Sequence, residues 1–315
     1  MWLNNISDLV TWLREKRARS VALQFPAGLK RKAAGIADAL SRQGFSVIIS
    51  GDPCYGACDL SLELLDYADV LVNFGHTPLL IHPDVLHIPY RVDFDPVVIR
   101  SALPFLKGKR IGLITTAQHT HLLPEIAEVL RNEGYDPIFQ CAGGRTPEPG
   151  QVLGCSFAAA RIPGVSEILF IGTGMFHPLG VQLATRAHVV ALDPFSGHAV
   201  EVDAGKFLRK RHALIEKARE AAHIGIIIST KQGQNRYDLG TRLLSLSDRA
   251  YLVFMKEVSP DELLNLGFEA YVNTACPRLA YDDQVRFPVP VLTPAEYEIL
   301  CGTRTWEDYA IDEML

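Results

Sequence analysis

Three widely spaced cysteines are the residues of this sequence best suited to chemistry. Cys58 follows an apolar run at 45–50 and a turn rich in glycine and proline, and a helix-like run at 60–65 comes after it. Asp59 is placed to cap that helix, and the partial positive charge of a helix N-terminus favours a thiolate. A thiolate binds iron or zinc, or acts as a nucleophile.

The other two cysteines, Cys155 and Cys276, lie 97 and then a further 121 residues along the chain. These spacings exclude a local chelate loop of the zinc-finger type. If the cysteines act together, the fold must bring three distant loops to one place.

Apolar runs of strand length alternate with helix-like segments through most of the chain. This order is typical of parallel sheets that helices cover on both faces. We expect strands at 21–25, 45–50, 68–74, 87–94, 110–116, 136–140, 167–171, 188–192, 223–229, 268–273 and 289–292, and helices at 6–16, 30–42, 60–65, 122–134 and 200–222.

The pattern restarts twice, and each round closes on a proline. Pro96, Pro194 and Pro294 are 98 and 100 residues apart. We interpret this spacing as three α/β modules, each a small parallel sheet flanked by helices and arranged around a common centre. The predicted modules are residues 1–106, 107–219 (with a connecting helix) and 220–315. A single long doubly wound sheet fits the element order equally well, but it does not explain the restarts.

The cysteines fall at the strand ends of these modules, where parallel sheets place their sites. Cys58 and Cys155 lie 38 and 39 residues before their closing prolines, in equivalent loops, whereas Cys276 lies only 18 before its own. The positions equivalent to Cys276 are near His76 and His177. Three converging thiolates would hold three irons of a 4Fe–4S cluster and leave the fourth iron open to a substrate or cofactor.

The remaining cysteines have less context. Cys54 and Cys58 resemble the start of the CxxxCxxC motif of conventional radical S-adenosylmethionine enzymes, but Ser61 stands where the third cysteine would be. We interpret Cys54 as a packed side chain and Cys141 and Cys301 as structural, since free cysteine is among the most buried residue types.

Composition excludes several classes of protein. The chain has 315 residues, 48% apolar and 21% charged, with a net charge of −5, so it has no electrostatic footprint for nucleic acid. No apolar run approaches the roughly 20 residues that span a bilayer. The N-terminus lacks the pattern of a signal peptide, and we expect a cytoplasmic protein without disulfides.

Three sequence blocks resemble the archaeal diphthamide synthase subunit of the diphthamide biosynthesis family, with similarity from about Val21 to Tyr297. The blocks are Gly51-Asp-Pro-Cys-Tyr-Gly-Ala-Cys-Asp59, Asn273-Thr-Ala-Cys-Pro-Arg278 and Pro290-Val-Leu-Thr-Pro-Ala-Glu-Tyr297. Supporting matches are Gly172-Thr-Gly-Met-Phe-His-Pro178, Ala191-Leu-Asp-Pro-Phe195 and Ser229-Thr-Lys-Gln-Gly-Gln234.

The resemblance implies a three-domain enzyme in which Cys58, Cys155 and Cys276 bind a 4Fe–4S cluster. Such an enzyme cleaves the bond from sulfur to Cγ in S-adenosylmethionine, and the resulting 3-amino-3-carboxypropyl radical adds to carbon 2 of a histidine imidazole on elongation factor 2. Methylthioadenosine is left. The family also implies a homodimer and an electron donor.

Glycine-rich strand ends and nearby polar residues are candidates to contact S-adenosylmethionine. They are Gly172, Gly174, His177, Asp193, Gly233 and Gln234. Asp193 could instead cap a turn, and His177 could be a satisfied histidine at a strand end. Met175 stands where related eukaryotic subunits often carry arginine, so a charged cofactor contact is not expected there.

Two other classes of function remain open at this stage. Quinolinate synthase also places three cysteines around an open-iron cluster, but the Tyr-Gly-Ala-Cys-Asp block argues against it. A non-catalytic partner subunit, or a scaffold stabilised by zinc, would retain cysteines without cleaving a cofactor. The presence of all three family cysteines favours a catalytically complete chain.

Overall fold

The computed structural model describes residues 6–314. The chain forms two compact units, one comprising residues up to Asp93 together with Ala117–His121, and the other Phe94–Thr116 together with residues from Leu122 onward. Within 6–314, no helix is both long enough and apolar enough to cross a membrane.

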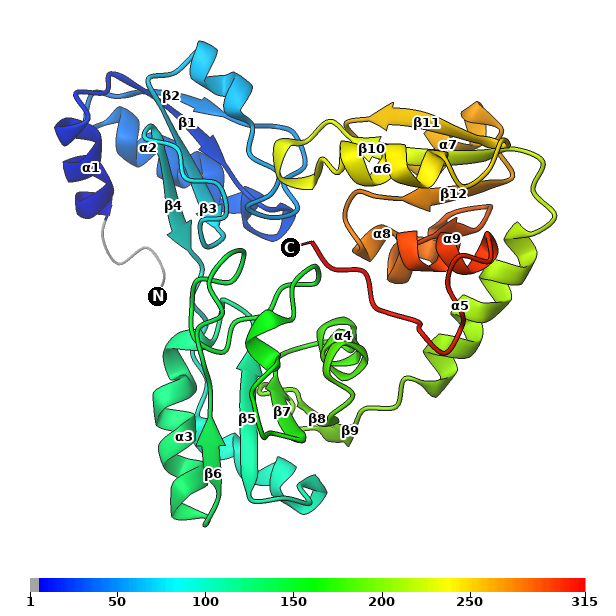
Figure 1. The fold of residues 1–315 in the computed structure, drawn as a ribbon. Coiled ribbons are helices and arrows are strands. Elements are labelled where there is room, and N and C mark those ends of the chain that lie inside the picture. The colour runs from blue at the N-terminus through cyan, green and yellow to red at the C-terminus, as the bar shows by residue number, and fades with distance from the viewer. Residues whose placement is uncertain (1–5, 315) are drawn as a thin grey trace. The chain divides into compact units, whose positions relative to one another are not determined.

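The first unit holds a four-stranded parallel sheet in the order β2-β1-β3-β4 (Figure 1). Because successive strand residues point to opposite faces, Val21 and Leu23 pack against α1 and α2 while Ala22 and Leu71 pack toward η2. The elements are α1 (Ile6–Glu15), β1 (Ser20–Gln24), η1 (Ala27–Lys32), α2 (Ala33–Ser41), β2 (Ser46–Ile49), η2 (Leu62–Asp66), β3 (Val70–Gly75) and β4 (Val85–Pro89).

The second unit contains two sheets. The first has the order β6-β5-β7-β8-β9, with β9 antiparallel to β8. Ile111 and Leu113 face α3 and η3, and Ile168 and Phe170 face α4. Its elements are η3 (Pro96–Phe105), β5 (Arg110–Thr115), α3 (Leu123–Asn132), β6 (Asp136–Ile138), η5 (Ala158–Ala160), β7 (Glu167–Ile171), α4 (Phe176–Thr185), β8 (His188–Leu192) and β9 (Ala199–Glu201). The short helix η4 (Thr120–Leu122) precedes α3, and its first two residues belong to the first unit.

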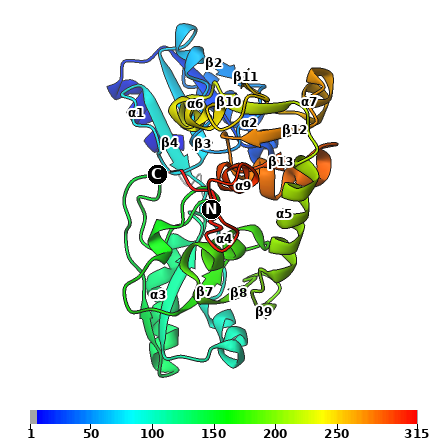
Figure 2. The ribbon, with the colours of Figure 1, turned by 45° about the vertical axis from the view of Figure 1, so that its right-hand side comes forward.

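The second sheet of this unit is parallel and has the order β11-β10-β12-β13 (Figure 2). Ile226 and Ile228 pack toward α5, α6 and α9, whereas Ile227 and Tyr271 pack toward α7 and α8. Its elements are α5 (Gly205–Ala218), β10 (Ile224–Ser229), η6 (Gln232–Gln234), α6 (Tyr237–Leu244), β11 (Ala250–Met255), α7 (Pro260–Leu266), β12 (Ala270–Asn273), α8 (Arg278–Tyr281), η7 (Asp283–Arg286), β13 (Val291–Leu292) and α9 (Pro294–Leu300).

The three sheets repeat one strand order, in which the first strand of each lies between the second and the third and the fourth lies outside the third. Each closing proline comes shortly after the fourth strand. The prediction of three small parallel sheets flanked by helices is therefore confirmed. The boundaries after residues 106 and 219 stay a prediction.

One ion pair is fully buried beneath the last sheet. The Arg211 guanidinium donates to both carboxylate oxygens of Glu296, at 2.7 and 2.5 Å, and to the carbonyl oxygens of Ala280 and Val291. Glu296 also accepts from the backbone N–H of Thr293, which caps α9. Neither charge reaches water, so each depends on the other for compensation.

We expect Arg211→Met to lower the free energy of unfolding by about 3–5 kcal/mol, because it leaves the Glu296 carboxylate buried without its cation. Urea denaturation measures this change. Adding Glu296→Gln should recover part of the loss, since the uncompensated charge disappears while an acceptor for Thr293 remains.

Arg286→Met is the matched control. Arg286 pairs with Asp283 at 3.7 Å on the surface, and its removal should cost less than about 1 kcal/mol. Equal losses in the Arg211 and Arg286 variants would contradict the argument.

Candidate functional site

The Cys58 loop is tied to its own sheet by polar contacts. The buried amide of Gln24 donates to the carbonyl oxygen of Asp59 at 2.8 Å and to the hydroxyl of Ser61 at 2.9 Å. The Lys30 ammonium donates to the carbonyl oxygens of Gly51 and Asp52. Cys58 itself is half-buried. The loop between β2 and η2 therefore has a fixed path along the sheet edge.

The expected helix cap beside Cys58 is wrong. The segment after the loop is a 3₁₀-helix of five residues, η2, with Ser61 rather than Asp59 at its N-cap and no side-chain cap hydrogen bond. Asp59 instead accepts from the backbone N–H of Tyr55 at 3.3 Å, within the loop. So short a helix has little dipole, and the predicted help to a Cys58 thiolate from a helix terminus does not apply.

Of the three remaining cysteines, Cys54 and Cys301 are at least partly buried, as expected for structural residues, and Cys141 is not. Cys54 is buried beside the Asn73 amide, and burial raises the pKa of its thiol to about 11. Partial burial also raises the pKa of Cys301. Cys141 is exposed, so its interpretation as a packed structural residue is wrong. Its Sγ donates to the Pro147 carbonyl oxygen at 3.0 Å in a surface loop.

Cys155 lies at the tip of a tight loop. The backbone groups of Leu153 and Ser156 pair with each other, which leaves Gly154 and Cys155 between them. Gly154 packs directly on the Phe176 ring at the start of α4, where a Cβ would lie 2.2 Å from a ring carbon. The half-buried Cys155 thiol lies 3.9 Å from the Arg145 guanidinium, and a cation at this distance stabilises negative charge on sulfur.

Cys276 lies three residues after the end of β12. Asn273, the last residue of that strand, donates to the Cys276 carbonyl oxygen at 2.8 Å and accepts from the Ala275 N–H at 3.0 Å. The Thr274 hydroxyl donates to the Ile227 carbonyl oxygen of the neighbouring strand. These contacts hold a half-buried cysteine at the carboxyl end of the sheet, immediately before α8.

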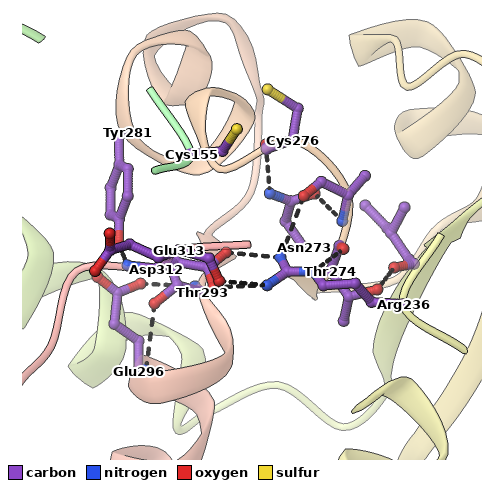
Figure 3. A network of polar contacts seen from close by, with 12 residues as sticks. Cys155, Arg236, Asn273, Thr274, Cys276, Tyr281, Thr293, Glu296, Asp312 and Glu313 are labelled. Carbon is purple, nitrogen blue, oxygen red and sulfur yellow. Dashed lines mark hydrogen bonds and ion pairs between the residues drawn. The ribbon is translucent and has the colours of Figure 1, made fainter. Parts of the chain in front are cut away.

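Cys155 and Cys276 both belong to the second unit, although 121 residues separate them in the sequence. Figure 3 shows both thiols on the same side of one polar network, which also includes Arg236, Asp312 and Glu313. Cys58 belongs to the other unit. Among residues 6–314, no group of three or more His, Cys, Asp or Glu side chains is placed to hold a metal ion. Of the three cysteines singled out in the sequence, the second unit contains Cys155 and Cys276.

Gly174 and His177 lie around the start of α4. Gly174 has φ +77°, a conformation that favours glycine, and no atom lies within 4 Å of the position that a Cβ would occupy. The His177 ring is in the first turn of the helix, not at a strand end, and is parallel to the Phe170 ring at 6.0 Å. Burial lowers the pKa of His177 to about 4, so it is neutral at pH 7.

Two further candidates have mainly structural contacts. The Asp193 carboxylate accepts from the backbone N–H groups of Phe195 and Ser196, at 2.9 and 3.3 Å, and so caps the turn before β9 as the alternative interpretation suggested. Gly172, between β7 and α4, donates its N–H to the Leu192 carbonyl oxygen.

Gly233 and Gln234 form the buried 3₁₀ turn η6 after β10. The Gly233 carbonyl oxygen accepts from Arg145 at 2.9 Å, through the same guanidinium that approaches Cys155. Arg145 thus links the Cys155 loop to η6. Sequence reasoning missed Arg145, Arg236 and the segment that carries Asp312, because no motif marks them and their partners are distant in the chain.

Comparison with known proteins places this site in context. The model of a family described as putative diphthamide synthesis protein matches residues 25–310. The 2-(3-amino-3-carboxypropyl)histidine synthase of Pyrococcus horikoshii is 38% identical, over 98% of this chain and 93% of that protein. Subunit 1 of the human synthase is 30% identical, over 95% of this chain and 72% of that protein.

A solved structure agrees with these sequence matches. The crystal structure of Dph2 from Pyrococcus horikoshii with a 4Fe–4S cluster matches with a TM-score of 0.92 and 37% identity, covering 98% of this chain and 93% of that one. The likeness covers 98% of this chain and therefore includes all three sheets. On sequence and fold together, the chain belongs to the diphthamide synthesis family.

Proposed function

We propose that this chain transfers the 3-amino-3-carboxypropyl group of S-adenosylmethionine to carbon 2 of a histidine imidazole on elongation factor 2, the first step of diphthamide biosynthesis. The observation that carries the proposal is the match over nearly the whole chain, at 37% identity and a TM-score of 0.92, to a Dph2 structure that contains a 4Fe–4S cluster. The name of the Pyrococcus relative, 2-(3-amino-3-carboxypropyl)histidine synthase, describes the same transfer.

We further propose Cys58, Cys155 and Cys276 as the cluster ligands, one from each of the modules 1–106, 107–219 and 220–315. Cys155 and Cys276 lie on the same side of one polar network in Figure 3, which supports the assignment, as does Arg145 beside the Cys155 sulfur. Three thiolates leave one iron for the substrate.

The chain's own residues suit a cationic substrate whose radical product must be protected from side reactions. A bound 4Fe–4S cluster supplies the single electron that breaks the sulfonium bond. The neutral imidazole of His177 does not repel a sulfonium, and the adjacent Phe170 and Phe176 rings exclude water. We propose that S-adenosylmethionine is contacted by residues from the set Gly172, Gly174, His177, Asp193, Gly233 and Gln234. The open space beside Gly174 allows a close approach there.

The proposal extends to partners and location. Elongation factor 2 is the protein substrate, an electron donor reduces the cluster, and two copies of the chain form a homodimer in the cytoplasm. These features are proposed from the family resemblance.

The ligand assignment predicts which cysteines matter. Cys58→Ala, Cys155→Ala and Cys276→Ala should each lose most of the iron that the wild-type chain binds after anaerobic reconstitution, because two thiolates cannot retain three irons. Iron analysis and the visible absorption of the cluster measure this loss.

Cys141→Ala and Cys301→Ala are the matched controls and should bind iron like the wild-type chain. Full iron content and activity in the Cys155→Ala protein would overturn the assignment.

The transfer reaction predicts one nucleoside product. The reconstituted and reduced protein, incubated with S-adenosylmethionine, should release methylthioadenosine, and only when reductant is present. Liquid chromatography with mass spectrometry identifies the product.

Release of 5′-deoxyadenosine would instead indicate a conventional radical enzyme. Absence of cleavage by a protein that holds its cluster would favour an accessory subunit or a quinolinate-type reaction.

A further inference from the structure

Arg236 uses all five of its N–H donors in one place. Its Nε donates to the Thr274 carbonyl oxygen at 2.6 Å, and Nη2 donates to the Ala275 carbonyl oxygen at 3.2 Å. Nη1 and Nη2 also donate to the two carboxylate oxygens of Asp312, at 2.8 and 2.7 Å. Nη1 donates in addition to the Glu313 carbonyl oxygen at 3.5 Å. One side chain thus joins the two residues that precede Cys276 to the C-terminal segment.

The C-terminal segment Ile311–Met314 continues from there to the other cysteine. The Met314 N–H donates to the Cys155 carbonyl oxygen at 2.8 Å. The Glu313 carboxylate accepts from the Phe157 N–H at 2.8 Å and pairs with Arg161. Ile311 is buried in the core that contains Phe157. The Cys155 loop is therefore held from both of its sides.

A third contact fixes this segment beside α8. The Asp312 N–H donates to the Tyr281 hydroxyl at 2.7 Å, and Tyr281 is the last residue of the helix that follows Cys276. Figure 3 shows Cys276 hydrogen-bonded to Asn273, and Arg236 hydrogen-bonded to the segment that contains Asp312 and Glu313. Asp312 is 8% exposed, so water does not compete strongly for its contacts.

We propose that the segment Ile311–Met314, latched by Arg236, is a positioning element that fixes the Cys155 and Cys276 loops relative to each other. The proposal rests on the assignment of these two cysteines as cluster ligands. Metal ligands must be held close to their working geometry by the residues around them, and here the backbone of each cysteine loop is bound to one short segment. Arg236 and Asp312 act through the loops and do not touch the cluster.

The competing explanation is that the segment merely stabilises the second unit. The two explanations differ in which part of the chain opens more often when the contact between Arg236 and Asp312 is weakened. A positioning element changes the exposure and geometry of Cys155 and Cys276 specifically, whereas a general stabiliser changes the unfolding of the whole unit.

The test uses thiol alkylation of the reduced, cluster-free chain, with the rate at each cysteine followed by quantitative mass spectrometry. Arg236→Lys keeps the charge but cannot supply five donors in a planar fork, and Asp312→Asn removes the charge of the latch while keeping its size. In both variants we expect Cys155 and Cys276 to react about tenfold faster with iodoacetamide, because local opening of their loops becomes easier. Cys301, which is half-buried in the same unit, should react at the wild-type rate, because the unit as a whole does not unfold more often.

Arg242→Lys is the matched control. Arg242 pairs with Glu298 at 2.6 Å in the same unit, and neither residue contacts a cysteine loop. This variant should leave all three alkylation rates unchanged. Wild-type rates at Cys155 and Cys276 in both latch variants would overturn the proposal, and so would equal acceleration of all three cysteines.

A second readout is the electron paramagnetic resonance spectrum of the reduced, reconstituted protein. A mispositioned ligand pair should give broadened or mixed signals in Arg236→Lys and Asp312→Asn, and one wild-type signal in Arg242→Lys. Identical spectra in all variants would count against the proposal. Alkylation needs no cluster, so its result is independent of whether the wild-type chain releases methylthioadenosine.

Discussion

Parallel strands all end at the same edge of their sheet, and the placement of the cysteines depends on this constraint. The three sheets repeat one strand order. Cys58 and Cys155 lie in the loops after the second strands of their sheets, β2 and β6, and Cys276 lies after the third strand of its sheet, β12. A single sheet could bring its own loops together but could not supply cysteines that are 97 and 121 residues apart in the sequence. Repeating the module solves that problem, because each copy contributes one thiol from its edge.

Charge is distributed so that the region around these loops has few uncompensated ions. The Arg145 and Arg236 guanidinium groups are occupied by backbone carbonyl oxygens, by a carboxylate or by the Cys155 sulfur. Burial keeps His177 neutral at pH 7 by lowering its pKa, and keeps Cys54 protonated by raising its own. A sulfonium substrate and an electron-rich cluster both require such surroundings, since a stray cation would repel the first and a stray anion the second.

The sequence allowed the fold class and the candidate cysteines to be predicted because both depend on local or periodic signals. Alternation of apolar runs marked the strands, and the spacing of Pro96, Pro194 and Pro294 marked the repeat. The cap at Asp59 failed because the length of a helix depends on the packing available to it, and η2 is only one short 3₁₀ segment. Cys141 was misread because nothing in the local sequence shows that its loop is exposed.

The contacts of Arg236 and Asp312 with the two cysteine loops could not be predicted from the sequence for a different reason. Arg236 and Asp312 are 76 residues apart, and most of the contacts around them use backbone groups, such as the Met314 N–H and the carbonyl oxygens of Thr274 and Ala275. Any amino acid supplies those groups, so no pattern of side chains records them. The family model likewise matches only residues 25–310, and the segment that binds the Cys155 loop begins at Ile311. A short stretch without a motif can therefore hold ligand loops in place whenever its backbone is pinned by one arginine with several partners.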